Sequence, residues 1–120
     1  TSYTPNVLSI YLLMRILERC PHIEEQHKTI VERYERWIDF FDRSQSLKHL
    51  ITSKSVQSFT VIPVTASSDL ILKIKTEAKT RGLLLGEGYG EWKASSFRIA
   101  NFPALENSEI EMLMRFFKRF

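Results

Sequence analysis

The stretch Gly86–Pro103, GEGYGEWKASSFRIANFP, constrains the fold of this chain more than any other part of the sequence. A glycine-rich loop leads into Ser96–Ala100, a segment in which apolar and polar side chains alternate. Successive side chains of a strand point to opposite faces, so Phe97 and Ile99 are expected to face a core. Arg98 would then lie in the middle of a β-strand, on its other face.

Two interpretations of Arg98 are open from the local pattern alone. A guanidinium on a rigid strand beside a flexible loop is suited to binding a carboxylate, because its planar fork can contact both oxygens. The alternative is a solvated arginine on a hairpin, since the outer face of an antiparallel strand is commonly polar. The local pattern by itself favours the solvated arginine.

The first helix is predicted over residues 7–19, after the turn Thr4-Pro5-Asn6, where proline fits the first helical turn. Its apolar side chains occupy most sides of the helix, which is typical of a helix packed against a larger body. We therefore expect a partner surface that these 120 residues do not supply. Cys20, next to the helix-ending Pro21, is interpreted as a buried helix-end residue.

Three further helices and three strands follow from periodicity and turn residues. An amphipathic helix is predicted over residues 22–42, with Arg33 on its charged outer face, and a third helix begins at Ser67 or Ser68. The last begins at Asn107 or Ser108, with Ser108 and Glu111 as a capping box. Strands are expected over residues 59–64, 83–85 and 96–100, with Pro63 at an edge or a bulge.

These elements predict an α+β sandwich in the order α-α-β-α-β-β-α, with a small, mainly antiparallel sheet covered by helices. We expect a single domain over residues 1–120, with a helical segment over 1–43 and the α+β sandwich over 59–120. The chain begins without methionine, which we interpret as a sign that it is a piece of something longer.

Charge and composition argue against several kinds of partner. The net charge is +3 with scattered lysines and arginines, so no nucleic-acid partner is expected. No apolar run reaches the roughly 18 residues that span a membrane, so no membrane partner is expected either. A single cysteine fits a reducing compartment, hence the cytoplasm. His22 and His27 are not at the spacing of paired ligands, and His49 is isolated, so no metal site is expected.

Two motifs in the chain are similar to a known family. The first is Tyr3–Tyr11, YTPNVLSIY, and the second runs from Gly82-Leu83 through Gly88 to Phe97–Pro103, FRIANFP. Together with the order of elements, they resemble the C-terminal small domain of class V, fold-type I aminotransferases that use pyridoxal phosphate (PLP). The likeness is greatest to the phosphoserine aminotransferases.

The resemblance implies roles for several residues. Arg98 matches the arginine that holds the substrate α-carboxylate, and Thr4 matches the threonine that binds the PLP phosphate across a homodimer. Tyr3, where the phosphoserine enzymes commonly carry asparagine, is a second cofactor candidate. These enzymes usually grip the substrate phosphate with a His-Arg pair, where this chain reads Tyr89–Lys93, YGEWK. Lys93 is the candidate replacement, opposed by Glu91.

The resemblance also implies an amino acid and a 2-oxo acid as substrates, and a large domain of the same chain as partner. The family's Schiff-base lysine lies in that large domain, and no lysine of this chain is in a matching context, so the 120 residues alone are expected to be inactive. Phosphoserine and 2-oxoglutarate, in serine biosynthesis, are the expected substrates. The alternatives are another class V enzyme, of alanine–glyoxylate or desulfurase-like type, and a non-enzymatic α+β binding module.

Overall fold

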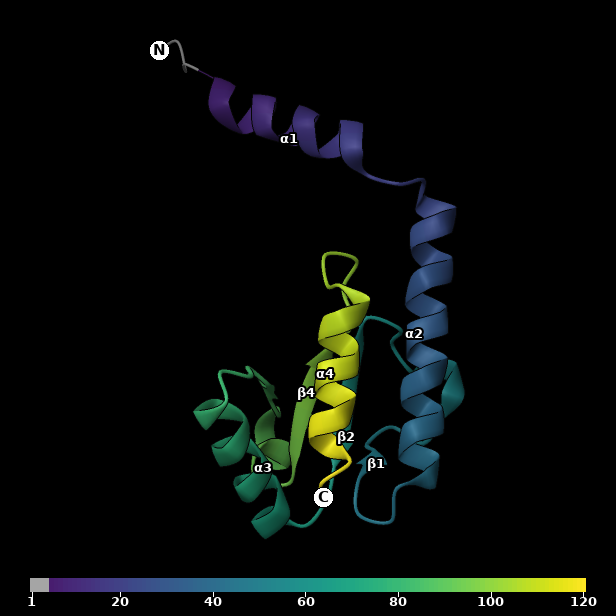
Figure 1. Cartoon of the computed structure of the whole chain (residues 1–120), viewed down its shortest axis with the longest axis vertical. Helices are drawn as coiled ribbons and strands as arrows, with labels where there is room; N and C mark the ends of the chain where they lie inside the picture. Colours follow the sequence, from purple (N-terminus) through teal and green to yellow (C-terminus); the bar gives the residue numbers. More distant parts are fainter. Residues whose placement is uncertain (1–4) are drawn as a thin grey trace.

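The computed structural model describes residues 5–120 and has the α+β architecture that the sequence predicts. Its helices are α1 (Val7–Arg19), α2 (Ile23–Arg43), α3 (Ser68–Thr80) and α4 (Asn107–Phe117) (Figure 1). The strands β1 (Lys48–His49), β2 (Val61–Thr65), β3 (Gly86–Glu87) and β4 (Ser96–Ala100) form one antiparallel sheet in the order β1-β2-β4-β3. Two short 3₁₀ turns, η1 (Lys54–Val56) and η2 (Gly90–Lys93), interrupt the loops. The two-residue β1 is an addition to the predicted order.

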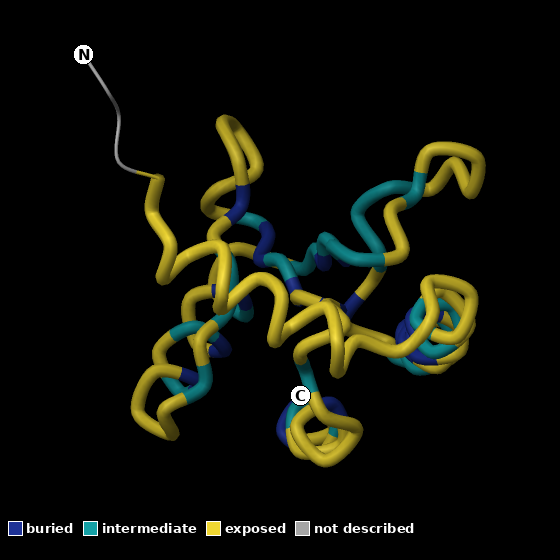
Figure 2. Tube along the Cα trace, turned by 90° about the horizontal axis from the view of Figure 1, so that it is seen from above, coloured by how far each residue is buried: buried dark blue, intermediate teal, exposed yellow. Residues whose placement is uncertain are grey.

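The pairing of β2 with β4 separates the two faces of the sheet. Val64 lies opposite Phe97 and Ile62 opposite Ile99, and all four side chains are buried beneath the helices. In Figure 2 the helices α2, α3 and α4 lie on one side of the strands, loops project from the other side, and α1 crosses the view in front of them. Arg98 lies opposite Pro63 on the face away from the helices, so the predicted orientation of β4 is confirmed.

An aromatic cluster holds α2 and α4 against this sheet. Trp37 stacks on Phe41 with ring centroids 5.7 Å apart and meets Phe117 edge-on at 6.0 Å. Phe117 in turn stacks on Phe97 of β4 at 5.2 Å. These four rings are almost completely buried, and such aromatic pairs contribute stability beyond the apolar area they bury. Phe117 therefore connects both helices to the central strand.

Pro63 differs from its predicted place. It lies in β2, which has a neighbour on each side, rather than at an edge or a bulge. Its carbonyl accepts a hydrogen bond from the Leu50 N–H at 2.9 Å, just after β1 ends at His49. The nitrogen of Pro63, which has no hydrogen to donate, points to the same side, where β1 no longer requires a donor. An inner strand thus tolerates proline because its neighbour is only two residues long.

Two predictions about element ends are also wrong. Leu83–Leu85 is not a strand: after the left-handed Gly82 the chain closes α3 with a Schellman turn, in which the Leu83 N–H donates to Ala78 O at 2.9 Å. Leu84 is consequently turned outward and is 94% exposed. The capping box of α4 is made by Glu106 and Glu109, two residues earlier than expected.

The burial of Arg33 and of Cys20 was also predicted incorrectly. Arg33 is only 7% exposed, because the loop after β4 folds over it. Its Nε donates to Asn107 Oδ1 at 2.7 Å and its guanidinium also contacts the Phe102 carbonyl at 3.4 Å. Cys20 is exposed, since α1 is not covered by any other element of residues 5–120.

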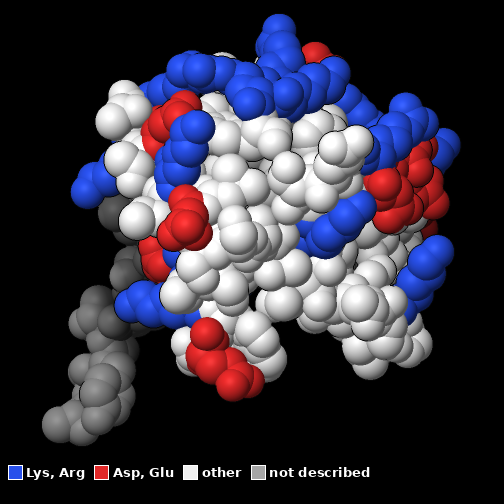
Figure 3. All heavy atoms as spheres, turned by 90° about the horizontal axis from the view of Figure 1, so that it is seen from below, with Lys and Arg blue, Asp and Glu red and all other residues white. Residues whose placement is uncertain are grey.

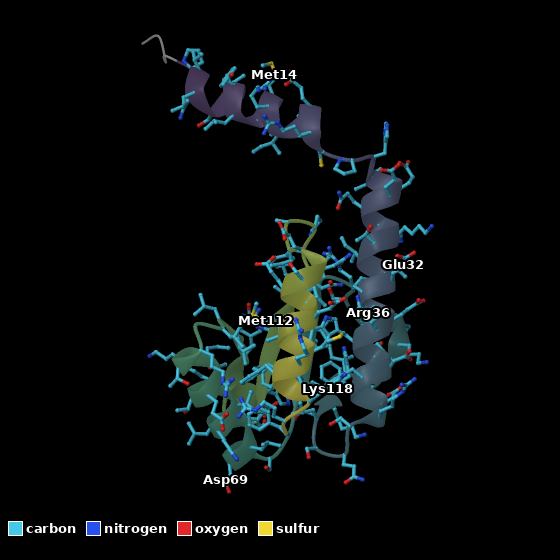
Figure 4. The ribbon with its side chains drawn as sticks, in the orientation of Figure 1. Met14, Glu32, Arg36, Asp69, Met112 and Lys118 are labelled. Atoms are coloured by element: carbon cyan, nitrogen blue, oxygen red, sulfur yellow. The ribbon has the colours of Figure 1, made fainter. Side chains whose placement is uncertain are left out.

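Helix α1 projects from the rest of the molecule (Figure 1). The radius of gyration is 17.6 Å, above the roughly 14 Å of a compact domain of this length. No residue of α1 is buried, and its large apolar side chains are 46–67% exposed, among them Met14, which lies beside no other element in Figure 4. The predicted need for a covering surface therefore persists. None of the described helices is long and apolar enough to cross a membrane.

Replacing Phe117 with alanine should destabilise the fold by about 3–5 kcal/mol, because it opens a cavity between three other buried rings. Urea unfolding followed by tryptophan fluorescence measures this change in the free energy of unfolding. Met112→Ala is the matched control on the same helix: Met112 is exposed, and its replacement should cost less than about 1 kcal/mol. Equal losses in the two variants would show that Phe117 does not hold the core together.

Candidate functional site

The guanidinium of Arg98 is fixed in position by the loop that follows β3. Its Nε donates to the Glu87 carbonyl at 2.7 Å, and its Nη1 donates to the Tyr89 hydroxyl at 2.7 Å. Its Cζ also lies 4.0 Å from the centre of the Tyr89 ring, a cation–π contact. These contacts set the plane of the guanidinium but occupy only two of its five N–H groups.

The remaining N–H groups of Arg98 have no acidic partner within the described part of the chain. No carboxylate of residues 5–120 lies within 4.0 Å of this guanidinium. A half-buried, pre-positioned cation without a counter-ion can accept one from a ligand. This observation favours the carboxylate-binding interpretation of Arg98 over the solvated one.

Gly86 allows Arg98 to adopt this position. The two residues are register partners in the pairing of β3 with β4, so they share the outer face of the sheet. A Cβ at position 86 would lie 3.2 Å from Arg98 Cβ and 3.5 Å from its Nε. The absence of a side chain therefore lets the arginine lie across β3 and reach the Glu87 carbonyl.

A pocket of about 340 Å³ opens beside Arg98 on this face of the sheet. One wall is Leu50 and Ile51, which follow the edge strand β1, and another is Trp92 of η2, which follows the other edge strand, β3. Pro63 contributes to the floor, on the face that it shares with Arg98. The pocket thus combines one cation with walls that are mainly apolar. The other lining residues are Gly88, Tyr89 and Ser96.

The Leu50–Ile51 wall is anchored to helix α2 through Gln57. The Tyr34 hydroxyl donates to Gln57 Oε1, and Gln57 Nε2 donates to the Ile51 carbonyl at 2.6 Å. The His49 ring also contacts the backbone of Ile51, with its Nδ1 2.7 Å from the carbonyl oxygen. Burial lowers the pKa of His49, although this backbone hydrogen bond opposes the shift. The neutral ring is therefore favoured within the wall.

The Trp92 wall is anchored by the glycine loop. The Ser96 hydroxyl donates to the Trp92 carbonyl at 2.7 Å, and Gly88 packs so closely beneath them that a Cβ would lie 2.7 Å from that carbonyl oxygen. The loop is therefore a tightly packed turn rather than a phosphate cradle. Tyr89 and Trp92 remain 68% and 49% exposed, with their rings accessible at the mouth of the pocket.

Lys93, the other predicted substrate-binding residue, does not line this pocket. The backbone carbonyl of Lys93 accepts a hydrogen bond from Lys75 Nζ at 3.0 Å, and the positive charge of Lys93 helps to lower the pKa of the Glu87 carboxyl. The same Lys75 ammonium binds Glu87 Oε2 at 2.8 Å, and this hydrogen bond lowers the pKa of the Glu87 carboxyl. Lys75 thereby ties α3 to the loop that positions Arg98. A substrate contact by Lys93 stays a prediction.

Replacing Lys75 with methionine should raise the pKa of Glu87 back toward its ordinary value, because the main hydrogen bond to the carboxylate is lost. The lowered pKa stabilises the fold above the unfolded-state value of about 4.3, and this contribution disappears as the pH falls through the folded-state pKa. Carbon NMR of the Glu87 carboxyl during a pH titration measures the change. Lys28→Met, which removes the Lys28–Glu32 pair, should leave the pKa of Glu87 unaltered.

The predicted cofactor contacts, Tyr3 and Thr4, lie outside the described residues. Within residues 5–120, no three His, Cys, Asp or Glu side chains gather closely enough to hold a metal ion. Asn101, three residues after Arg98, is fully buried and has a structural role. Its Nδ2 donates to the carbonyls of Ile30 and Phe59, which joins α2 to the segment before β2.

Many lysine and arginine side chains gather away from the pocket beside Arg98. Seen from below, Lys and Arg side chains form a band along one edge of the molecule (Figure 3). A larger hollow of about 580 Å³ between the ends of α2 and α4 is lined by Arg36, Arg43 and Lys118. Arg36 lies 3.5 Å from Glu111, and Asp39 also lines the hollow, so this surface is of mixed charge. Arg98 is far from these groups in the sequence and lies on the opposite face of the sheet.

The sequence did not point to Leu50, Ile51 and Gln57 as parts of a site. They lie in a polar connector. Gln57 contacts Tyr34, and Leu50 and Ile51 line the same pocket as Arg98, so this site joins segments that are far apart in the chain. The adjacent apolar residues Leu50 and Ile51 were the only local feature of this connector that could have indicated a pocket wall. Tyr89 and Trp92 belong to the glycine loop that the sequence singled out, and the pocket brings both beside Arg98.

Comparison with known proteins gives matches in structure alone. No family model and no curated protein matches the chain. A phosphoserine aminotransferase from Cytophaga hutchinsonii matches 98% of this chain with a TM-score of 0.78 and 24% identity. A mutant of C-DES, with glycine covalently linked to its PLP cofactor, matches 84% with a TM-score of 0.64 and 18% identity. This chain has the fold of the matched segment.

The chain is much shorter than both solved proteins. It spans 33% of the length of the aminotransferase and 25% of the length of the C-DES chain. At these identities the likeness establishes the fold and confirms the expected small α+β domain. The activity of either protein is a property of a chain three to four times as long.

Proposed function

We propose that this chain is the small domain of a PLP-dependent aminotransferase, in which Arg98 binds the carboxylate of the amino-acid substrate. The observation that carries the proposal is the pre-positioned guanidinium of Arg98, which faces a pocket and has no acidic partner among residues 5–120. The shared fold supports the proposal, because in both matched proteins the segment with this fold is part of a longer chain.

In this proposal the described residues bind substrate and the rest of the enzyme binds the cofactor. PLP supplies an electron sink for the carbon that bears the amino group. The pocket beside Arg98 suits a substrate better than the cofactor, because none of its lining residues is a lysine. Arg98 would fix the substrate carboxylate, and the walls would limit access of water. Thr4 and Tyr3 remain the candidates for the PLP phosphate, and the Schiff-base lysine would come from the larger domain.

The exposed surface of α1 supports a larger assembly. Its apolar side chains would be covered by the large domain of the same chain, as is usual for apolar patches of this extent. We propose further that the intact enzyme is a cytoplasmic homodimer. The 120 residues alone would be inactive, because the cofactor lysine is contributed from outside them.

Phosphoserine as the amino donor, in serine biosynthesis, is a finer version of this proposal. It requires a second cation at the substrate phosphate, and Lys93 is the candidate in the glycine loop. Lys93 does not line the pocket beside Arg98, whose walls are mainly apolar. The pocket therefore favours an amino acid other than phosphoserine.

In the intact enzyme that carries this chain, Arg98→Ala should raise the KM for the amino acid about 100-fold, since charge-assisted hydrogen bonds to the carboxylate are lost. PLP absorbance of the purified protein should remain unchanged, because Arg98 contacts the substrate alone. Steady-state kinetics and an absorbance spectrum measure the two quantities.

Two controls sharpen this experiment. Arg98→Lys keeps the charge but loses the planar fork, so its KM should lie between those of wild type and Arg98→Ala. Arg36→Ala removes an arginine from the opposite face and should leave KM unchanged. An unaltered KM in Arg98→Ala would remove Arg98 from substrate binding. A purified protein without PLP absorbance would contradict the enzyme class and favour the binding-module alternative.

A further inference from the structure

We infer that the pocket beside Arg98 takes a monocarboxylate that carries an apolar side chain, either branched aliphatic or aromatic. This inference rests on the proposed function in treating Arg98 as the carboxylate site. It goes further by assigning the class of side chain that the substrate carries, and it depends on the walls of the pocket rather than on Arg98 alone.

The polar groups of the pocket define one end of the ligand. Arg98 presents its unused N–H groups, while the Tyr89 hydroxyl already accepts a hydrogen bond from Arg98. The Ser96 hydroxyl is engaged with the Trp92 carbonyl at 2.7 Å. Among the lining residues, Arg98 is therefore the single charged group, and it matches the single negative charge of a carboxylate.

The walls define the other end of the ligand. Leu50 and Ile51 form one wall and Trp92 another, and Pro63 lies on the same sheet face as Arg98. These side chains would desolvate whatever part of a ligand extends beyond its carboxylate. An apolar group gains from that contact, whereas a polar group against the Leu50, Ile51 and Pro63 side chains would lose its water without gaining a hydrogen bond from them. A volume of about 340 Å³ is at the small end of the range for ligand pockets.

A phosphorylated side chain does not fit this arrangement. A phosphate monoester carries a charge of about −1.5 to −2 at neutral pH and three strong acceptor oxygens. Lys75 and Lys93 are the nearest lysines in the glycine-loop region, but Lys75 is bound to Glu87 Oε2 and to the Lys93 carbonyl. Neither ammonium lines the pocket. A phosphate placed against Leu50, Ile51 and Pro63 would meet no donor, and the single indole N–H of Trp92 cannot replace a second cation.

Both walls are held in place before any ligand binds. Gln57 ties Ile51 to Tyr34 of helix α2, and the close packing of Gly88 fixes the backbone of Trp92. A pre-formed apolar surface lowers the entropic cost of binding, because little ordering remains to be done. The specificity of the pocket is thus built into the fold of this chain.

The test measures direct binding to the purified 120-residue chain by NMR titration and calorimetry. The probes are 3-phenylpropanoate, 4-methylpentanoate, O-phosphoserine and the uncharged 3-phenylpropanamide. We expect the two apolar carboxylates to bind at least about tenfold more tightly than O-phosphoserine, the size of effect typical of one complementary apolar contact. The amide should not bind measurably, because it lacks the negative charge that Arg98 recognises.

Three variants assign the binding to this pocket. Arg98→Ala should abolish binding of both carboxylates. Trp92→Ala, and Leu50→Ala on the other wall, should each weaken 3-phenylpropanoate about tenfold. Leu84→Ala is the matched control, since Leu84 is an apolar residue of the same region that is 94% exposed and lies outside the pocket.

The outcomes separate this inference from the proposed function. Tighter binding of O-phosphoserine would overturn the apolar class but leave Arg98 as a carboxylate site. Binding of 3-phenylpropanoate that persists in Arg98→Ala, or a failure of both apolar carboxylates to bind, would overturn the inference. The enzyme class is decided independently by the PLP absorbance of the intact protein.

Discussion

The antiparallel pairing of β2 with β4 is the constraint on which the rest of this structure depends. Register partners share a face of the sheet, so Phe97 and Ile99 must both turn toward the helices once they oppose Val64 and Ile62. The same register directs Arg98 outward. A slip of one residue would bury the guanidinium and expose Phe97, at a large cost in apolar burial. The core that stabilises the domain therefore also fixes the direction of the candidate functional side chain.

The walls of the pocket depend on the same core, although they are built from loops. Ile51 is tied to helix α2 through Gln57 and Tyr34, and burial raises the pKa of that tyrosine, so its hydroxyl stays a donor. Trp92 is tied to β4 through Ser96. Each loop has one anchor on an element of the core, which gives the pocket a defined shape without regular secondary structure around it.

The sequence was most informative where a feature depends on local periodicity. The bounds of β4 and α1 were predicted exactly, because alternation and a proline-led helix are local patterns. It failed at Leu83–Leu85, where a short apolar run reads as a buried strand although the Schellman turn at Gly82 directs Leu84 outward. It also failed at Arg33, whose partner Asn107 is 74 residues away. The walls of the pocket were missed for the same reason, since no local pattern encodes which distant segments will meet.

Asn101 is a structural amide in the same short segment as the candidate residue Arg98. Its backbone N–H donates to the Thr60 carbonyl at 2.8 Å, and its side chain donates to the carbonyls of Phe59, two residues before β2, and of Ile30 in α2. It therefore sets the position of α2 relative to the sheet. Because α2 carries Tyr34, this position also determines where Gln57 holds the Ile51 wall. Arg98 and the Ile51 wall of the pocket are thus linked through a residue that does not itself line the pocket.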